Sequence, residues 1–328
     1  MPEVAKWAKA PKIGDQPKKT LYGAILDDID NDGSEFDSVK HPIVFLNMFA
    51  TPMLVVNDPQ VVMDLFITKN RNFDKMSRTQ LLFSDLMGNT FLFSPGDQVW
   101  KAKRKAVAHA FYKEKIVHMT EILKHKITKQ SEQWLHEIRS SPTGSTEIAT
   151  NALFDVFCRN IVHVSFGQDI CDEIIEIEVP DAATGKIISR KMTFMKALNK
   201  VITQMVLSYT IKFYNPANWL SYQFAGKVFN VTAHQRRVAL NAKKIRDFVN
   251  DYVQKRKRGE NKSELAEGSD LLSVFLSAPP EIFTDEFIID ELVDFFMAAS
   301  GTTNLATRTM VAHFAKCPES LARVRKEY

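Results

Sequence analysis

The stretch FTDEFIIDELVDFFMAASGTTNLAT, Phe283 to Thr307, decides how the C-terminal part of this chain of 328 residues folds. It has apolar residues at helical spacing up to Ala299 and then changes to four poor helix formers, Ser300 to Thr303. One interpretation is a helix that ends at Ala299, a turn, and a second helix capped by Thr303 or Asn304. The other is one continuous helix of roughly thirty residues, about 45 Å long. In that helix Gly301 costs about 1 kcal/mol and the hydroxyls bond back to preceding carbonyls, which opens a groove for a ligand.

A second informative stretch is WKAKRKAVAHAF, Trp100 to Phe111. Trp100 and Arg104 are four residues apart and therefore share a helix face, with Lys103 and His109 close by. An indole N–H and a guanidinium on one face suit a large flat anion with carboxylates. The alternative is an amphipathic helix with a solvated basic side, which is the commoner meaning of such a pattern.

Most of the remaining chain is helical in pattern. Two short β-rich runs, Ile43 to Phe49 and Met53 to Val56, predict a hairpin turned at Ala50 to Pro52. Asp58-Pro59 then supplies the cap and first residue of a helix. Helical spacing predicts further helices at about Asp97 to Phe111, Glu114 to Arg139, Glu147 to Phe166, Met195 to Ile211, Ala225 to Arg258, and from Asp285 onward, with loops at 140–146, 213–219, 259–270 and 277–284.

Composition excludes several classes of protein. With 45% hydrophobic and 25% charged residues the chain has the composition of a soluble globular protein, and its net charge of +4 is too small to indicate a nucleic-acid partner. Three cysteines, Cys158, Cys171 and Cys317, match neither a disulfide framework nor a zinc spacing and favour a reducing compartment. Residues 1–21 form a polar segment without an apolar run of the length of a signal peptide or membrane helix, so we expect no transmembrane segment.

Two other motifs have simple interpretations. The acidic stretch Asp27 to Val39 begins like a calcium-binding loop, but Val39 occupies the position of the bidentate glutamate, so a solvated acidic turn is favoured. The basic run Lys255 to Glu260 lies at the end of a long predicted helix, just before Gly259. Its cations complement the helix dipole and the glycine suits the C′ position, so it is interpreted as a helix terminus.

Taken in order, these segments resemble a cytochrome P-450. The matching stretches are PMLVVNDPQVVMDLF with NFDK, LFSPGDQVWKAKRKAVAHAF with its W-x-x-x-R pattern, DVFCRNIVHVSFGQDI, SDLLSVFL, the long FTDEF stretch, and AKCPESLARVRKEY. The resemblance covers about Tyr22 to Tyr328. It implies a mainly α fold with a small N-terminal β-hairpin, of which residues 22–328 are the N-terminal two thirds of a single domain.

The resemblance also implies a haem-dependent monooxygenase that inserts one atom of O₂ into an apolar substrate. Trp100, Arg104 and Lys103 would hold the propionates of haem b, Ala298 would lie over the haem, and Thr302 would be the catalytic threonine that helps to protonate bound dioxygen. Electrons would come from NADPH through a flavoprotein reductase. Substrate contacts would come from the loop Gln80 to Phe93, the helix around Met195 to Val206, and the long helix; the named residues are Leu82, Phe83, Phe93, Phe295, Ala299 and Thr303.

Two departures from the family pattern affect these expectations. Gly301 stands where the pattern has an acid and Ala299 where it has a glycine, so water would carry protons to Thr302 without a carboxylate. The sequence also contains neither the E-x-x-R helix nor the loop whose cysteine supplies the axial thiolate. We therefore expect weak or no stable haem binding and no turnover from this chain as written. The alternative is a non-catalytic helical binding or regulatory protein derived from a truncated monooxygenase. The expected location is intracellular, either cytoplasmic or peripheral on an internal membrane.

Overall fold

The computed structural model describes residues 43–48, 51–56, 58–75, 77–108, 111–144, 152–265 and 269–327. The chain divides into two compact units, Met1–Asp74 and Lys75–Tyr328, and each is described by itself. The polar segment 1–21, the acidic stretch from Asp27 to Val39 and His109 lie outside the described residues.

The first unit contains the hairpin predicted from the sequence. Strands β1 (Ile43–Met48) and β2 (Thr51–Val56) are antiparallel and pair in register from Ile43 opposite Val56 to Met48 opposite Thr51. Helix α3 (Pro59–Met63) follows directly, and the Asp58 carboxylate accepts hydrogen bonds from the first free amides, as the Asp-Pro pair predicts. A π-helical turn, Asp64–Thr68, and a 3-10 turn, Asn70–Asn72, complete the described part of this unit.

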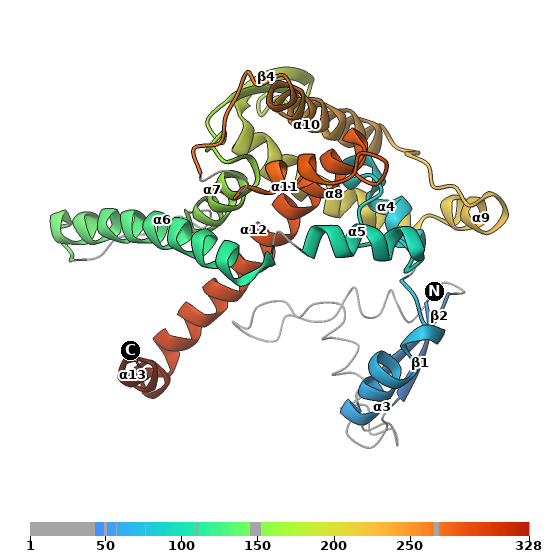
Figure 1. Cartoon of the computed structure of the whole chain (residues 1–328), viewed down its shortest axis with the longest axis horizontal. Helices are drawn as coiled ribbons and strands as arrows, with labels where there is room; N and C mark the ends of the chain where they lie inside the picture. The colour runs from blue at the N-terminus through green and yellow to red at the C-terminus, as the bar shows by residue number, and fades with distance from the viewer. Residues whose placement is uncertain are drawn as a thin grey trace. The chain divides into compact units, whose positions relative to one another are not determined.

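The second unit is built on helices from its start (Figure 1). The first four are α4 (Ser77–Met87), α5 (Gln98–Ala108), α6 (Lys113–Ser140) and α7 (Ala152–Phe166). The prediction of a loop from Gln80 to Phe93 is wrong for its first half, because α4 continues to Met87 and buries Leu82 and Leu86. Residues 88–97 connect α4 to α5 without helix or strand, and the first seven of them, Gly88 to Ser94, are hereafter called the 88–94 loop.

A second hairpin, which the sequence analysis missed, follows α7. Strands β3 (Ile174–Pro180) and β4 (Ile187–Thr193) are antiparallel, and alternate residues of β3 are buried: Ile175, Ile177 and Val179. This period of two in IIEIEVP is the ordinary signature of a half-buried strand. The side chain of Asn241 holds the strand, since its Oδ1 accepts from the Glu178 N–H at 2.8 Å and its Nδ2 donates to the Glu178 carbonyl at 2.7 Å.

Four further helices follow the second hairpin: α8 (Phe194–Tyr214), α9 (Pro216–Ala225), α10 (Ala233–Lys257) and α11 (Leu271–Ser277). The predicted loop at 213–219 is wrong, because Asn215 alone separates α8 from α9 and caps the second helix. Helix α10 begins eight residues later than predicted (233 against 225), because Gly226 ends α9 in a left-handed conformation and a Thr232–Gln235 capping box starts α10. Its C-terminus is followed by Gly259 at φ +72°, as the capping interpretation predicts.

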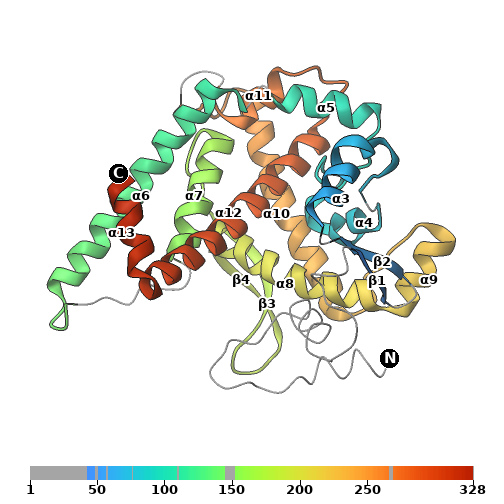
Figure 2. The same ribbon diagram turned by 90° about the horizontal axis from the view of Figure 1, so that it is seen from below.

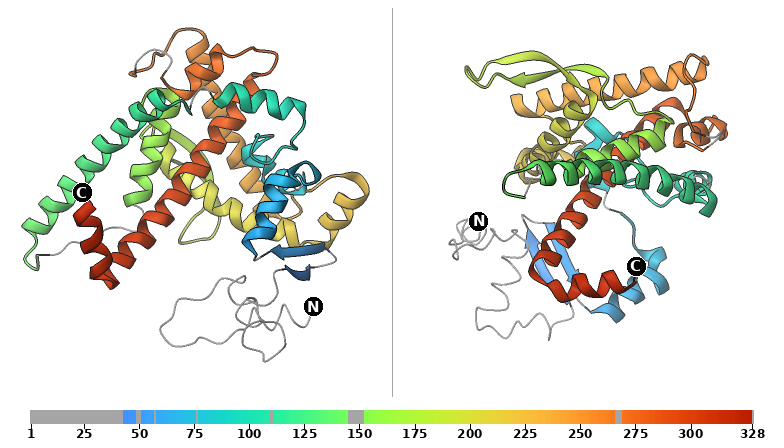
Figure 3. Two further views of the ribbon diagram at one scale, coloured as in Figure 1. Left: turned by 60° about the horizontal axis from the view of Figure 1, so that its bottom comes forward. Right: turned by 90° about the vertical axis from the view of Figure 1, so that its left-hand side faces the viewer.

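The long stretch forms one helix, α12 (Asp285–Lys316, 32 residues), followed by α13 (Pro318–Glu327). Thr284 caps its start, and the helix passes through Ser300 to Thr303 without a break. The continuous interpretation is therefore confirmed, and the turn at Ser300 is wrong. Figures 2 and 3 show the full length of α12 in red.

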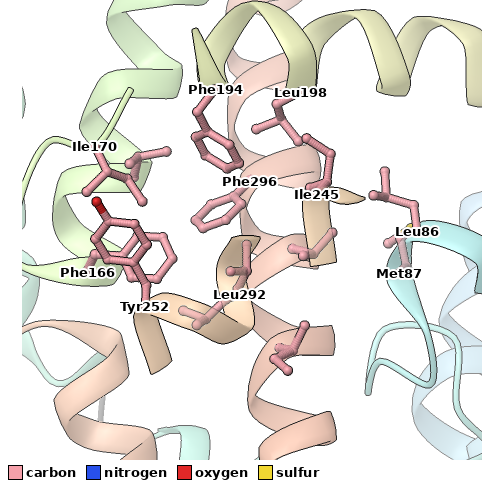
Figure 4. Packing of buried hydrophobic residues seen from close by; sticks show 14 of the residues in the cluster. Leu86, Met87, Phe166, Ile170, Phe194, Leu198, Ile245, Tyr252, Leu292 and Phe296 are labelled. Carbon is pink, nitrogen blue, oxygen red and sulfur yellow. The ribbon is translucent and has the colours of Figure 1, made fainter. Parts of the chain in front are cut away.

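The N-terminal half of α12 forms the centre of the core, where it contacts α4, α7, α10 and α11. Phe296 is fully buried, with its ring centroid 5.5 Å from Phe166 and 6.2 Å from Phe194 (Figure 4). Burial of this kind contributes about 1.5–3 kcal/mol for each large side chain, so packing rather than propensity holds the helix. Among the described helices we find none whose length and hydrophobicity would allow it to cross a bilayer.

Candidate functional site

The centre of α12 has hydroxyls that bond back to the helix, as the continuous interpretation predicts. The Thr302 Oγ donates to the Ala298 carbonyl at 2.7 Å, and the Ser300 hydroxyl donates to the Phe296 carbonyl. Ser300 is buried, whereas Thr302 and Thr303 are exposed. Apart from the neighbouring residues and backbone of its own helix, a Cβ placed on Gly301 would meet no described atom within 4 Å. The helix therefore presents a small-residue surface with open space beside Gly301.

Helix α5 positions Trp100 and Arg104 on one face. The guanidinium carbon of Arg104 lies 5.1 Å from the centroid of the indole, and Lys75 Nζ lies 4.5 Å from the same ring. Arg104 is exposed, and no carboxylate pairs with it among the residues that the structure describes. Lys103 points elsewhere, with its Nζ 3.8 Å from the centroid of Phe287 on α12. Arg104 is thus the cation on this face that remains available to a carboxylate.

The indole N–H of Trp100 is already used within the protein. It donates to the Phe91 carbonyl at 2.7 Å, and Lys75 Nζ donates to the same oxygen at 2.7 Å. The sequence suggested that this N–H could bind an anion, but here it fixes the 88–94 loop. Its neighbour Arg104 has no hydrogen bond or ion pair with another described residue.

Three carboxyl side chains of α12 meet the 88–94 loop from the other side. Asp290 Oδ2 accepts from the Asn89 N–H at 2.7 Å, and Glu291 Oε1 accepts from the Phe91 N–H at 2.7 Å. Asp294 is hydrogen-bonded to the side chain of Thr90. The sequence analysis assigned these acids no role. Their signal was available, because three acids interrupt an otherwise apolar helix face.

Burial strongly perturbs two of these carboxyls. It raises the pKa of Glu291 to about 9 and that of Asp294 to about 7, because the charged form loses its hydration. Burial also raises the pKa of Asp290, although Arg246 opposes the change from 2.6 Å. At neutral pH Glu291 is therefore a neutral carboxyl group, which can still accept a hydrogen bond at its carbonyl oxygen.

The residues predicted to contact substrate form two aromatic groups. Phe83 stacks with Phe93 at 5.3 Å between ring centroids and with Tyr209 of α8 at 4.5 Å. Phe295 lies 6.3 Å from Phe91 and 5.6 Å from Phe111. The remaining three do not join these groups in the same way: Leu82 is buried in the core, Ala299 is half-buried and Thr303 is exposed.

The cysteines decide how far these residues fit a haem. Cys158 and Cys171 are fully buried, and hydrogen bonding with Cys158 together with burial holds the pKa of Cys171 far above its usual range. Neither thiol can serve as an exposed thiolate ligand. Cys317 is half-buried at the C-terminus of α12. The described residues thus offer a cation and a small-residue surface of the kind that a haem needs, and neither of the two buried thiols is placed to bind its iron.

The long buried helix, the surrounding helices and the small antiparallel hairpins together form a cytochrome P-450 fold. The crystal structure of a mutant haem domain of cytochrome P-450DA superposes with a TM-score of 0.62 over 93% of this chain and 58% of that chain, at 16% identity. Sequence comparison extends this likeness from the fold to the family. The model of the family described as Cytochrome P-450 matches residues 30–328. The chain belongs to the cytochrome P-450 family.

Several plant proteins are relatives of this chain. Cytochrome P-450 CYP94D108 from Paris polyphylla is 27% identical over 86% of this chain and 52% of its own length. Cytochrome P-450 94A1 from Vicia sativa is 23% identical over 77% of this chain and 45% of its own length, and cytochrome P-450 71A9 from Glycine max is 23% identical over 89% and 55%. The chain therefore spans about half the length of the curated relatives it matches.

Proposed function

We propose that this chain is part of a haem-dependent monooxygenase that inserts one atom of O₂ into an apolar organic substrate. The observation that carries the proposal is the stretch Gly301 to Thr303, with exposed threonines at 302 and 303, in the middle of a helix whose first half is buried. A family member with this stretch presents a threonine hydroxyl beside open space, where a ligand can approach the helix.

The residues of the chain would act by binding and by moving protons. Arg104 would hold a propionate of haem b through charge-assisted hydrogen bonds. Lys103 would serve as a second cation only after its Nζ leaves the ring of Phe287. Bound haem would supply the oxidative chemistry. Thr302 Oγ, which now donates to the Ala298 carbonyl, would rotate to donate to a ligand and take its next proton from water. Water would have to do this because Gly301 offers no carboxyl group.

The aromatic side chains define the class of substrate and partners that we propose. Phe83, Phe93 and Phe295, with Phe91 beside them, favour a hydrophobic small molecule. Electrons would come from NADPH through a flavoprotein reductase. The proposed location is intracellular, either cytoplasmic or peripheral on an internal membrane.

A titration with hemin tests the propionate contact in a longer protein that contains this chain and supplies the cysteine ligand. Binding can be followed by quenching of tryptophan fluorescence, since Trp100 lies next to Arg104. Arg104→Ala should weaken binding by about 10- to 150-fold, which corresponds to about 1.5–3 kcal/mol for hydrogen bonds to a charged group. Lys101→Ala, an exposed cation on the same helix, is the control. Equal affinities for Arg104→Ala and the parent chain would contradict the assignment.

The role of Thr302 is tested in a longer protein that contains this chain and binds haem through a cysteine. Thr302→Ala should increase the share of electrons that leave as hydrogen peroxide, whereas Thr302→Ser, which keeps the hydroxyl, should behave like the parent. Identical coupling of electrons to product in all three proteins would remove Thr302 from the proton path.

A further inference from the structure

The 88–94 loop is attached to α12 at three consecutive residues. The carboxyls of Asp290 and Glu291 accept the N–H groups of Asn89 and Phe91, and Asp294 binds the Thr90 side chain. The approach is so close that a Cβ on Gly88, which has φ +60°, would lie 2.0 Å from Asp290 Oδ1. The loop is therefore seated on the helix by many specific contacts, although it has no regular structure of its own.

Phe91 is the residue on which these contacts converge. Its N–H is held by Glu291, and its carbonyl accepts from both Trp100 Nε1 and Lys75 Nζ, each at 2.7 Å. The peptide groups on both sides of the residue are thus fixed by side chains from elsewhere in the unit. With the backbone fixed on both sides, the Phe91 ring has few orientations, and it lies 6.3 Å from the ring of Phe295.

Burial of Glu291 and Asp294 is destabilising, which indicates that their hydrogen bonds to the 88–94 loop compensate for it. Glu291 is 0% exposed, and its Oε2 has no hydrogen-bond partner within the described part of the chain. Asp294 Oδ1 is also buried without a hydrogen-bond partner among the described residues. Leaving a buried polar atom unpaired is destabilising, and an apolar side chain at either position would avoid that cost. The compensating contact of Glu291 is its bond to the Phe91 N–H.

We propose that Glu291 is a positioning residue, which fixes the Phe91 ring beside Phe295 by accepting the Phe91 N–H, and that the side chain at position 91 thereby limits which substrates fit. This inference rests on the proposed function in one respect: it assumes that Phe91 and Phe295 lie in the region that contacts substrate. Glu291 acts through Phe91 and contacts no reacting group itself.

Variants at position 291 separate acceptance of the hydrogen bond from charge and size. Glu291→Gln keeps a carbonyl oxygen at the same place, whereas Glu291→Leu and Glu291→Met remove it. Glu286→Leu, at an exposed position on the same helix, is the matched control. Two readings are taken on the 328-residue chain: amide hydrogen exchange of residues 89–94, and fluorine NMR of 4-fluorophenylalanine placed at position 91. Exchange of the α10 amides reports whether the fold is intact.

The apolar variants should increase exchange in residues 89–94 by at least about tenfold, as the loss of about 1.4 kcal/mol of local stability requires. They should also move the fluorine resonance, while the Gln variant and the Glu286→Leu control stay close to the parent. Parent-like exchange in the Leu and Met variants, or equal loosening in the Gln variant, would overturn the inference. So would a loss of α10 protection in both apolar variants, since Glu291 would then be a general structural residue. Identical coupling of electrons to product in Thr302→Ala and its parent, in the longer haem-binding protein, would count against the proposed function and leave these readings unaffected.

Discussion

Replacing Glu291 by Gln should flatten the pH dependence of the unfolding free energy in the alkaline range. The ordinary pKa of a glutamate is 4.5, and burial raises that of Glu291 to about 9 in the folded chain. Between these values the folded state holds a proton that the unfolded state has released. The stabilising contribution of the neutral group is therefore complete below pH 4.5 and is lost progressively as the pH rises through the pKa of about 9.

The magnitude follows from linkage. One extra bound proton in the folded state lowers the unfolding free energy by about 1.4 kcal/mol for each pH unit. Asp294, whose pKa burial raises to about 7, contributes to the same slope only at lower pH. Between about pH 7 and about pH 8.5 the parent chain should thus lose about 2 kcal/mol more than the Gln variant. The neighbours Asp290, Lys103 and the Phe91 amide are the same in both chains.

Urea unfolding followed by circular dichroism at several pH values measures this difference. Glu286→Gln, at an exposed position on the same helix, is the control and should follow the parent chain. Parallel curves for the parent and Glu291→Gln above pH 7 would show that Glu291 does not carry a bound proton in the folded state, and the reasoning from burial would be refuted.

Three further predictions concern stability and are measured by urea unfolding. Gly88→Ala should lower the free energy of unfolding by about 3 kcal/mol, because the left-handed backbone costs about 1–2 kcal/mol and the new Cβ displaces the buried Asp290. Gly226→Ala, which has a similar φ and open space, should lose only the backbone contribution, and equal losses in the two variants would contradict the clash. Phe296→Ala should cost about 3–5 kcal/mol through the cavity it leaves, and a loss under about 1 kcal/mol would mean that the site is loosely packed. Asn241→Leu should cost about 1–3 kcal/mol for each of the two Glu178 backbone groups it leaves unpaired, and no loss would show that water replaces the amide.

Local signals in the sequence predicted those elements that local chemistry determines. The Asp58-Pro59 pair starts α3, and Gly259 follows the end of α10, because a cap depends on residues within one turn of it. The first hairpin was predicted from two β-rich runs. The strand IIEIEVP carried an equally clear alternation but was not assigned, so β3 and β4 could have been found by the same test.

Contacts between distant segments could not be predicted in this way. Asn89 and Asp290 are 201 residues apart, and nothing in the sequence around either residue indicates that they form a hydrogen bond. The continuity of α12 through Gly301 is a similar case, since propensity favours a break and burial of the first half of the helix overrides it. The use of the Trp100 N–H by the Phe91 carbonyl also depends on where the 88–94 loop is seated.

The open space beside Gly301 has an evolutionary consequence. Any glycine codon becomes an aspartate or glutamate codon through a single base change, and apart from the neighbouring residues and backbone of the helix no described atom lies within 4 Å of where the new Cβ would stand. The substitution would also recover some of the roughly 1 kcal/mol of helix propensity that glycine forfeits. A single base change would therefore be enough to place an acid at position 301, where the described surroundings leave room for its Cβ.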